Sequence, residues 1–131
     1  MRIPMHETLN EEEALLLKTA RSVSKSFGRS YWLEKWEKKE PPDELWEEMR
    51  RQGLTGVGVP ERYGGSGFGL MGAVLTQEAL ALEGLPVLQF LVTHFSRHIV
   101  LSAGTEEQIR RFVTPTCTDG RRMSFALTEP E

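Results

Sequence analysis

The first part of the chain shows apolar positions three or four residues apart, which is the spacing of one face of an α-helix. Asn10, with Glu13 three residues later, matches a capping box and marks the start of this helix. The pair Pro41-Pro42 ends it, because the residue before a proline is disfavoured in helical conformation. The predicted apolar stripe consists of Leu16, Ala20, Val23, Phe27 and Tyr31.

Three further helices are predicted at about residues 42–52, 70–82 and 86–103, and each ends at or near a glycine. The first half of helix 86–103 is apolar on nearly every side. A helix that is apolar all round is normally enclosed by its neighbours. We therefore expect helix 86–103 to be the central one.

The connection over residues 53–69 is rich in glycine, which predicts irregular structure with one short extended piece at 57–59. Within it and just beyond, Gly67 to Gly72 matches the dinucleotide-binding fingerprint G-x-G-x-x-G. That fingerprint requires a strand immediately before it, within a βαβ unit, and residues 60–65 make a poor strand. We interpret the match as part of a glycine-rich connection.

The end of the chain changes from helical to extended patterning. Thr105 and Gln108 form a second capping box, which predicts a short helix to about Val113 and then a polar turn that ends at Gly120. Residues 123–128 have the pattern of a strand. A lone strand cannot satisfy its own backbone groups, so a β-domain is expected to accompany it.

The predicted fold is therefore all-α, a bundle of about five helices with one terminal β-strand that belongs to a middle β-domain. We divide the chain into a helical domain at 1–121 and the start of that β-domain at 122–131.

Candidate metal and redox chemistry is sparse. His94 and His98 lie four residues apart and could face one metal ion, but no third ligand stands at a suitable spacing. We interpret both as core or interface histidines and predict no metal site. Cys117 is the only cysteine, which excludes an internal disulfide, and we expect a structural or surface thiol.

Charge and hydropathy exclude two further classes of protein. The formal net charge of −3 is not that of a general nucleic-acid binder. The most apolar stretch, residues 85–101, is interrupted by polar side chains and cannot cross a membrane, and the first residues have no apolar signal region. We expect a cytoplasmic protein.

Four segments, in order along the chain, resemble the acyl-CoA dehydrogenase family. They are Pro42–Trp46 with Gln52–Leu54, the loop Val59–Gly67, the helix start Gly104–Gln108, and Phe125–Pro130, which looks like the opening of the family's flavin-binding signature.

The resemblance implies an amino-terminal helical domain, a middle β-domain and a carboxy-terminal helical bundle, with FAD held between them. Phe125, Leu127 and Thr128 would contact the flavin ring through backbone groups and the threonine hydroxyl. The central helix would line the acyl-chain pocket, with Leu91 and Phe95 as the contacting side chains. The implied partners are an acyl-CoA substrate and an electron-transfer flavoprotein or similar acceptor, and the full-length parent would be a homo-oligomer.

The resemblance assigns no catalytic residue to this chain, because the catalytic glutamate of most members lies in the carboxy-terminal domain. We therefore expect the chain to be inactive alone. Two alternatives stay open: a related flavoenzyme (an acyl-CoA oxidase, a reductase or a nitroalkane oxidase), and a complete, non-catalytic helical interaction module.

Overall fold

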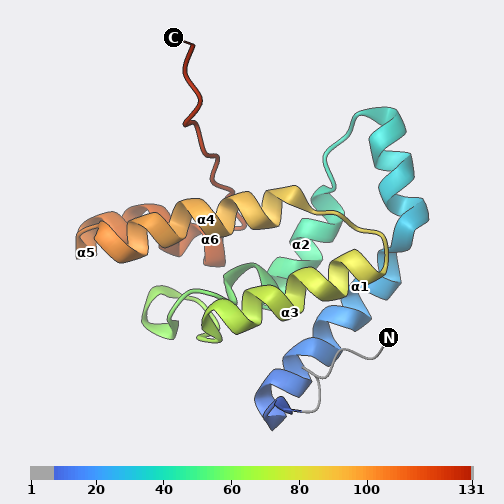
Figure 1. The fold of residues 1–131 in the computed structure, drawn as a ribbon, viewed down its shortest axis with the longest axis horizontal. Helices are drawn as coiled ribbons and strands as arrows, with labels where there is room; N and C mark the ends of the chain where they lie inside the picture. The colour runs from blue at the N-terminus through green and yellow to red at the C-terminus, as the bar shows by residue number, and fades with distance from the viewer. Residues whose placement is uncertain (1–7, 131) are drawn as a thin grey trace.

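The computed structural model describes residues 8–130, and its regular structure is helical, as predicted. The described part of the chain contains no strand, and none of its helices is long and apolar enough to cross a membrane. Figure 1 shows the helices packed side by side. They are α1 (Glu11–Lys38), α2 (Asp43–Arg51), α3 (Gly69–Leu82), α4 (Leu88–Ala103), and a last helical stretch built from α5 (Glu106–Gln108), the π-helical turn η4 (Ile109–Val113) and α6 (Thr114–Thr118).

Helix α1 begins at the predicted capping box, where the Asn10 side chain accepts from the Glu13 backbone N–H at 2.8 Å. It is bent sharply at Gly28, whose φ of 71° and ψ of 177° are not helical (Figure 1). Beyond the bend, the Tyr31 hydroxyl donates to the Glu44 carboxylate of α2 at 2.7 Å. This contact ties the second half of α1 to α2.

The main hydrophobic core lies where α1, α2, α3 and the start of α4 meet. Leu45 and Met49 of α2 and Leu75 of α3 are completely buried there. A second cluster packs the glycine-rich connection against the last helical stretch. Its buried members are Val59, Tyr63, Ile109, Val113 and Cys117, whose free thiol was expected to be structural or on the surface and is buried.

The glycine-rich connection doubles back on itself between α2 and α3. Residues 57–59, where we expected a short extended piece, lie between two short 3₁₀ turns, η2 (Leu54–Gly56) and η3 (Glu61–Tyr63). Backbone bonds cross the loop instead: Ser66 N–H donates to the Gly56 carbonyl at 3.0 Å, and Gly67 N–H donates to the Val59 carbonyl at 3.0 Å. No strand precedes α3, so the geometry that a dinucleotide fingerprint requires is not formed by the described residues.

The last helical stretch is longer than predicted. Thr105 and Gln108 form the expected capping box, but the helix continues past Val113 to Thr118. Pro115 is accommodated because it lies in the first turn of α6, directly after the π-helical turn, where a missing N–H breaks no essential helical bond.

The terminal strand predicted at 123–128 is not formed. These residues are irregular and leave the helical bundle as a single extended segment (Figure 1). The physical reason is that a strand needs a neighbour to pair with, and the described residues offer none.

Candidate functional site

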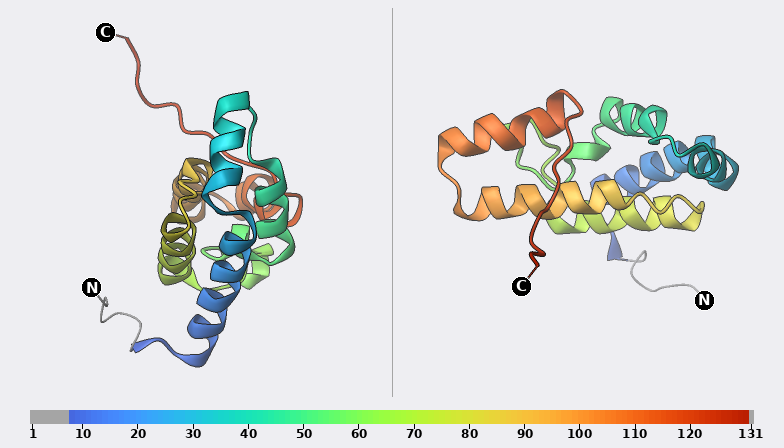
Figure 2. Two further views of the ribbon diagram at one scale, coloured as in Figure 1. Left: turned by 90° about the vertical axis from the view of Figure 1, so that its right-hand side faces the viewer. Right: turned by 90° about the horizontal axis from the view of Figure 1, so that it is seen from above.

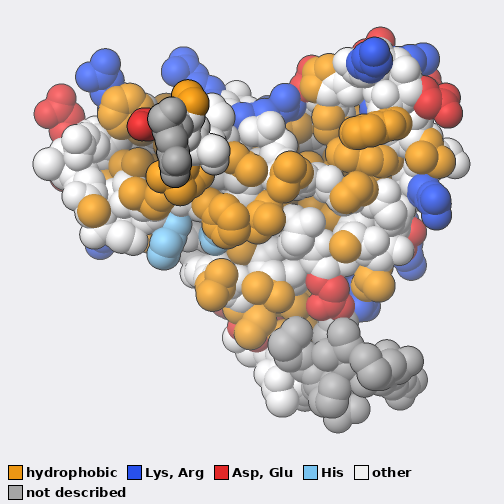
Figure 3. Space-filling model, turned by 45° about the horizontal axis from the view of Figure 1, so that its top comes forward, with side chains coloured by type: hydrophobic (Ala, Val, Ile, Leu, Met, Phe, Trp, Pro, Cys, Tyr) orange, Lys and Arg blue, Asp and Glu red, His pale blue; other side chains and the backbone are white. Residues whose placement is uncertain are grey.

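One face of α4 is open to solvent although it is strongly apolar. Leu88 is 66 % exposed, Phe95 53 % and Ile99 52 %, whereas Phe90 on the inner face is buried. The expectation that this helix is enclosed on all sides is therefore wrong for the described residues, because only one of its faces packs on the bundle. Figure 3 shows apolar side chains gathered around the two imidazoles on this side of the molecule. Contiguous exposed apolar surface of this kind marks a ligand groove or a contact with another domain.

A pocket of about 530 Å³ opens along this face, in the size range typical of small-molecule sites. It lies between α4, the glycine-rich connection with the start of α3, and the carboxy-terminal segment. The lining residues are Gly58, Gly69, Leu70, His94, Phe95, His98, Ile99 and Phe125.

The pocket brings together two of the five site residues that the sequence suggested, Phe95 and Phe125. Leu91 lies one helical turn before Phe95 and is more than one-third exposed, but it does not line the pocket. Leu127 and Thr128 are exposed on the segment that leaves the bundle and do not line the pocket.

Side chains of α4 hold the start of the carboxy-terminal segment and so position Phe125. The Met123 N–H donates to the Thr93 hydroxyl at 3.2 Å, and the Gln89 side-chain amide donates to the Met123 carbonyl at 3.3 Å. The Ser96 hydroxyl donates to the Ser124 carbonyl at 3.2 Å. The segment consequently crosses α4, as the right-hand view of Figure 2 shows.

His94 is the most enclosed polar group of the pocket, with 9 % of its surface exposed. Its ring packs against Gly58, where a built Cβ would lie only 2.4 Å from the imidazole Cε1, so any larger residue there would displace the ring. Burial lowers the pKa of His94, and the nearby Arg97 and His98 lower it further. The imidazole is therefore neutral at neutral pH.

Both histidines line the pocket. The His98 ring stacks on that of His94, with ring centroids 6.3 Å apart and planes 16° from parallel. Sequence reasoning treated both as core or interface residues. The signal that could have found them is their spacing, since His94, Phe95, His98 and Ile99 occupy one face of α4 on two successive turns.

Arg97 lies on the inner side of α4 and does not line the pocket. It is 1 % exposed, and one of its terminal nitrogens donates to the Thr55 carbonyl. Its other two nitrogens have no hydrogen-bond partner among the described residues, and burial lowers its pKa. Its influence on the pocket is electrostatic, through the pKa of His94.

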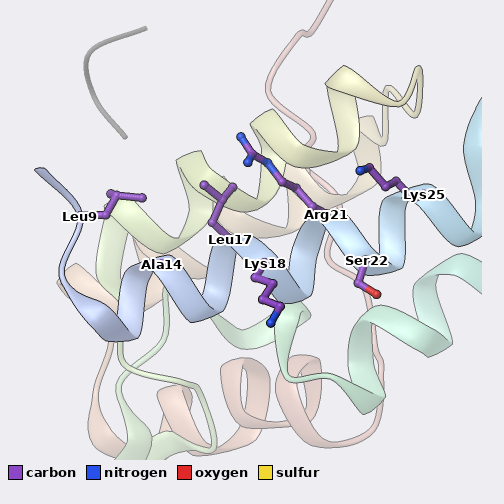
Figure 4. A pocket seen from close by; sticks show the side chains of 7 residues that line it. All are labelled: Leu9, Ala14, Leu17, Lys18, Arg21, Ser22 and Lys25. Atoms are coloured by element: carbon purple, nitrogen blue, oxygen red, sulfur yellow. The ribbon is translucent and has the colours of Figure 1, made fainter. Parts of the chain in front are cut away.

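A second depression runs along α1 (Figure 4). It is lined by Leu9, Ala14, Leu17, Lys18, Arg21, Ser22 and Lys25. Figure 4 shows Lys18 pointing to one side of α1 and Arg21 and Lys25 to another, so these cations do not converge on one point. Residues 8–130 also contain no group of three or more His, Cys, Asp or Glu side chains that could hold a metal ion. The pocket on α4 is the stronger candidate site.

Comparison with known proteins identifies the relatives of this fold. The sequence profile of "Acyl-CoA dehydrogenase, N-terminal domain" matches residues 10–120. The chain is 34% identical over 123 residues to acyl-CoA dehydrogenase FadE12 of Mycobacterium tuberculosis, covering 93% of this chain and 32% of that protein. It is 30% identical over 124 residues to the caffeyl-CoA reductase-Etf complex subunit CarC of Acetobacterium woodii, covering 92% of this chain and 33% of that protein.

Among solved structures, butyryl-CoA dehydrogenase of Megasphaera elsdenii superposes with a TM-score of 0.81 at 27% identity, covering 99% of this chain and 34% of that one. The chain thus spans about one-third of the length of these relatives. The profile match over most of the chain and the shared helical fold show that this chain belongs to the acyl-CoA dehydrogenase family, as its amino-terminal domain.

Proposed function

We propose that this chain is the amino-terminal part of an FAD-dependent acyl-CoA dehydrogenase, an enzyme that introduces a double bond between the α and β carbons of an acyl-CoA thioester. The observation that carries the proposal is the pocket that is lined by both Phe95 of α4 and Phe125 of the carboxy-terminal segment. Family membership supplies the reaction class, and the apolar lining suits a fatty acyl chain.

The role of α4 is to bind the acyl chain and exclude water from it. Leu91 and Phe95 lie on the open face of the helix, where an alkyl chain can cover them. Each methylene group removed from water there contributes about 0.8 kcal/mol to binding. The helix therefore supplies binding and orientation, and no residue of this chain is assigned as the catalytic base.

Residues 125–130 fit the family's flavin contact. Their backbone N–H and C=O groups hydrogen bond to no other described residue, so Phe125, Leu127 and Thr128 can direct them to a ring system. The Thr128 side chain is exposed and adds a hydroxyl. The chemistry that bound FAD would supply is that of a hydride acceptor. This chain would orient the flavin ring, and the rest of the FAD site would come from other parts of the enzyme.

A reductase is the second candidate, favoured by the 30% identity to a subunit of a caffeyl-CoA reductase-Etf complex. The same pocket would then bind an α,β-unsaturated acyl-CoA as the substrate. An electron-transfer flavoprotein, or a similar carrier, would be the electron partner in either direction. An oxidase would use oxygen in place of this carrier.

The test uses the full-length polypeptide that contains this segment, purified with FAD. A dehydrogenase is expected to be yellow and to lose its flavin absorbance when a saturated acyl-CoA is added. A reductase whose flavin has first been reduced with dithionite would be reoxidised by an enoyl-CoA, and an oxidase would consume oxygen. A protein that neither retains nor takes up FAD would contradict the whole proposal and favour the interaction module.

A pair of matched variants tests the role of the pocket. Phe95→Ala removes a lining side chain, whereas Phe112→Ala removes a phenylalanine that is 47 % exposed and lies outside the pocket. We expect Phe95→Ala to raise the KM for a medium- or long-chain acyl-CoA roughly tenfold, equivalent to about 1.4 kcal/mol of lost apolar contact. Phe112→Ala should leave the KM unchanged. Equal effects of the two variants would remove Phe95 from the site.

A further inference from the structure

The pocket on α4 contains a polar group that a plain hydrocarbon chain does not need. Its aromatic and aliphatic lining side chains are Leu70, Phe95, Ile99 and Phe125. His94 and His98 are the only lining side chains able to hydrogen bond, among the residues that the structure describes. Of these two, His98 is exposed, whereas His94 lies within the wall.

His94 is unusual because its buried side chain has no hydrogen-bond partner within residues 8–130. Neither of its ring nitrogens bonds to another described residue, and Nδ1 is shielded from solvent as well. Burying an imidazole without a partner is unfavourable, and buried polar groups in proteins are normally hydrogen bonded. A leucine at this position would line an alkyl pocket without that penalty.

The position of the ring shows which atom is available to a ligand. Nδ1 is shielded from solvent and lies against Gly58, so Nε2 is the ring nitrogen left to face a bound molecule. The ionisable neighbours that act on the ring are Arg97 and His98, and both disfavour its protonation. The ring therefore stays neutral and carries one donor and one acceptor.

We propose that the acyl group bound in this pocket carries an uncharged oxygen, a hydroxyl or a ketone, that hydrogen bonds to His94. A hydroxyl can donate to or accept from a neutral imidazole, and a ketone can accept from its N–H. A carboxylate does not fit, because the apolar lining offers its charge no counter-ion. The inference rests on the proposed function and narrows its substrate class to acyl-CoA thioesters oxygenated along the chain.

The test compares acyl-CoA substrates with the FAD-loaded, full-length enzyme. The substrates are octanoyl-CoA and a series of octanoyl-CoA derivatives with a hydroxyl or keto group at successive carbons beyond the β carbon. We expect kcat/KM for at least one derivative to exceed that for octanoyl-CoA by about tenfold, since a site with an unpaired polar group discriminates against a substrate that cannot pair with it.

Two variants with the same substitution assign the effect to one residue. His94→Leu should reduce the ratio of kcat/KM for the oxygenated substrate to kcat/KM for octanoyl-CoA to about one. His98→Leu, one turn further along α4, should leave the preference unchanged. His94→Gln keeps a neutral hydrogen-bonding group and should retain part of the preference, which guards against an effect of misfolding.

The outcomes separate the two proposals. If no acyl-CoA bleaches the flavin, the proposed function fails. If octanoyl-CoA is a substrate but no oxygenated derivative is preferred by the unmodified enzyme, only the inference about the substrate class is overturned. A preference lost in His98→Leu but kept in His94→Leu would also overturn the assignment to His94.

Discussion

The substitution Gly65→Ala tests why the glycine-rich connection needs its glycines. Gly65 lies against the backbone of Val59, across the loop that supports the pocket. A Cβ built on Gly65 would lie 2.0 Å from the Val59 carbonyl oxygen and 2.5 Å from its carbonyl carbon. Gly65 has no left-handed backbone conformation, so the effect of alanine would come from this overlap alone. Because the obstacle is backbone, no side-chain rotation can relieve it.

The expected loss follows from the distances. A carbon and a carbonyl oxygen normally approach to about 3.3–3.6 Å, so the two backbone segments must separate by more than ~1 Å. The bonds from Ser66 N–H to Gly56 O and from Gly67 N–H to Val59 O, both 3.0 Å, would then be lost or lengthened. Each contributes about 1 kcal/mol net, and unpaired groups beside the fully buried Val59 add to the loss. We expect Gly65→Ala to lower the free energy of unfolding by about 3 kcal/mol or more.

The assay is urea unfolding of the 131-residue chain, followed by tryptophan fluorescence and circular dichroism. Gly69→Ala is the matched control, since a Cβ there would meet no atom within 4 Å. Its φ of +59° alone predicts a loss of about 1–2 kcal/mol. If Gly65→Ala is no more destabilising than Gly69→Ala, the argument from backbone overlap is refuted.

Three further predictions concern α1 and the last helical stretch. The pKa of Tyr31 is raised from 10.0 to about 12, first by burial and then by its hydrogen bond to Glu44. The stability that the neutral phenol contributes is therefore complete below pH 10 and is lost as the pH rises to about 12. An ultraviolet titration of the tyrosines should show a component near pH 12 that is absent in Tyr31→Phe. A wild-type titration curve without this component would contradict the contact between Tyr31 and Glu44. Thr105→Ala removes the bond from the Gln108 N–H to the Thr105 hydroxyl and should lower the free energy of unfolding by about 1 kcal/mol, whereas Thr105→Ser should not. Equal urea midpoints for Thr105→Ala and Thr105→Ser would refute a stabilising role of this cap. Gly28→Ala should lower the free energy of unfolding by about 1–3 kcal/mol, because the backbone angles of Gly28, φ 71° and ψ 177°, are accessible essentially to glycine alone. An unchanged urea midpoint in this variant would disprove the prediction.

Features of the fold that depend on neighbours in the sequence could be predicted. The capping boxes at Asn10 and Thr105 both form, because each needs only a side chain and a backbone group three residues apart. The bend at Gly28 could not be predicted, because one glycine in a helical pattern is normally tolerated. The direction of the second half of α1 depends instead on contacts with another element, such as the bond from Tyr31 to Glu44 of α2.

The candidate site could be predicted from the sequence to the extent that its residues lie on one face of α4. Phe95 was suggested from the resemblance, and the structure places it in the pocket together with Phe125. The packing of His94 on Gly58 could not be read from the sequence, because only the folded loop brings the two residues together. The strand expected at 123–128 failed for a related reason, since strand formation depends on a pairing partner and not on the segment's own pattern.

The orientation of α4 is the strongest physical indication that its outer face is functional. The inner face buries Thr93 and Arg97, while the outer face exposes Phe95 and Ile99. If the helix only had to stabilise this bundle, the opposite face would be expected to point inward. That orientation would bury the apolar side chains, which stabilises the fold by about 25 cal/mol per Å² of apolar surface, and it would return the Arg97 guanidinium to water. In the part of the chain that the structure describes, the helix instead leaves two nitrogens of Arg97 without a hydrogen-bond partner and exposes Phe95 and Ile99. Such a conflict between local chemistry and burial is expected at a functional site, where the exposed face serves a ligand or another domain.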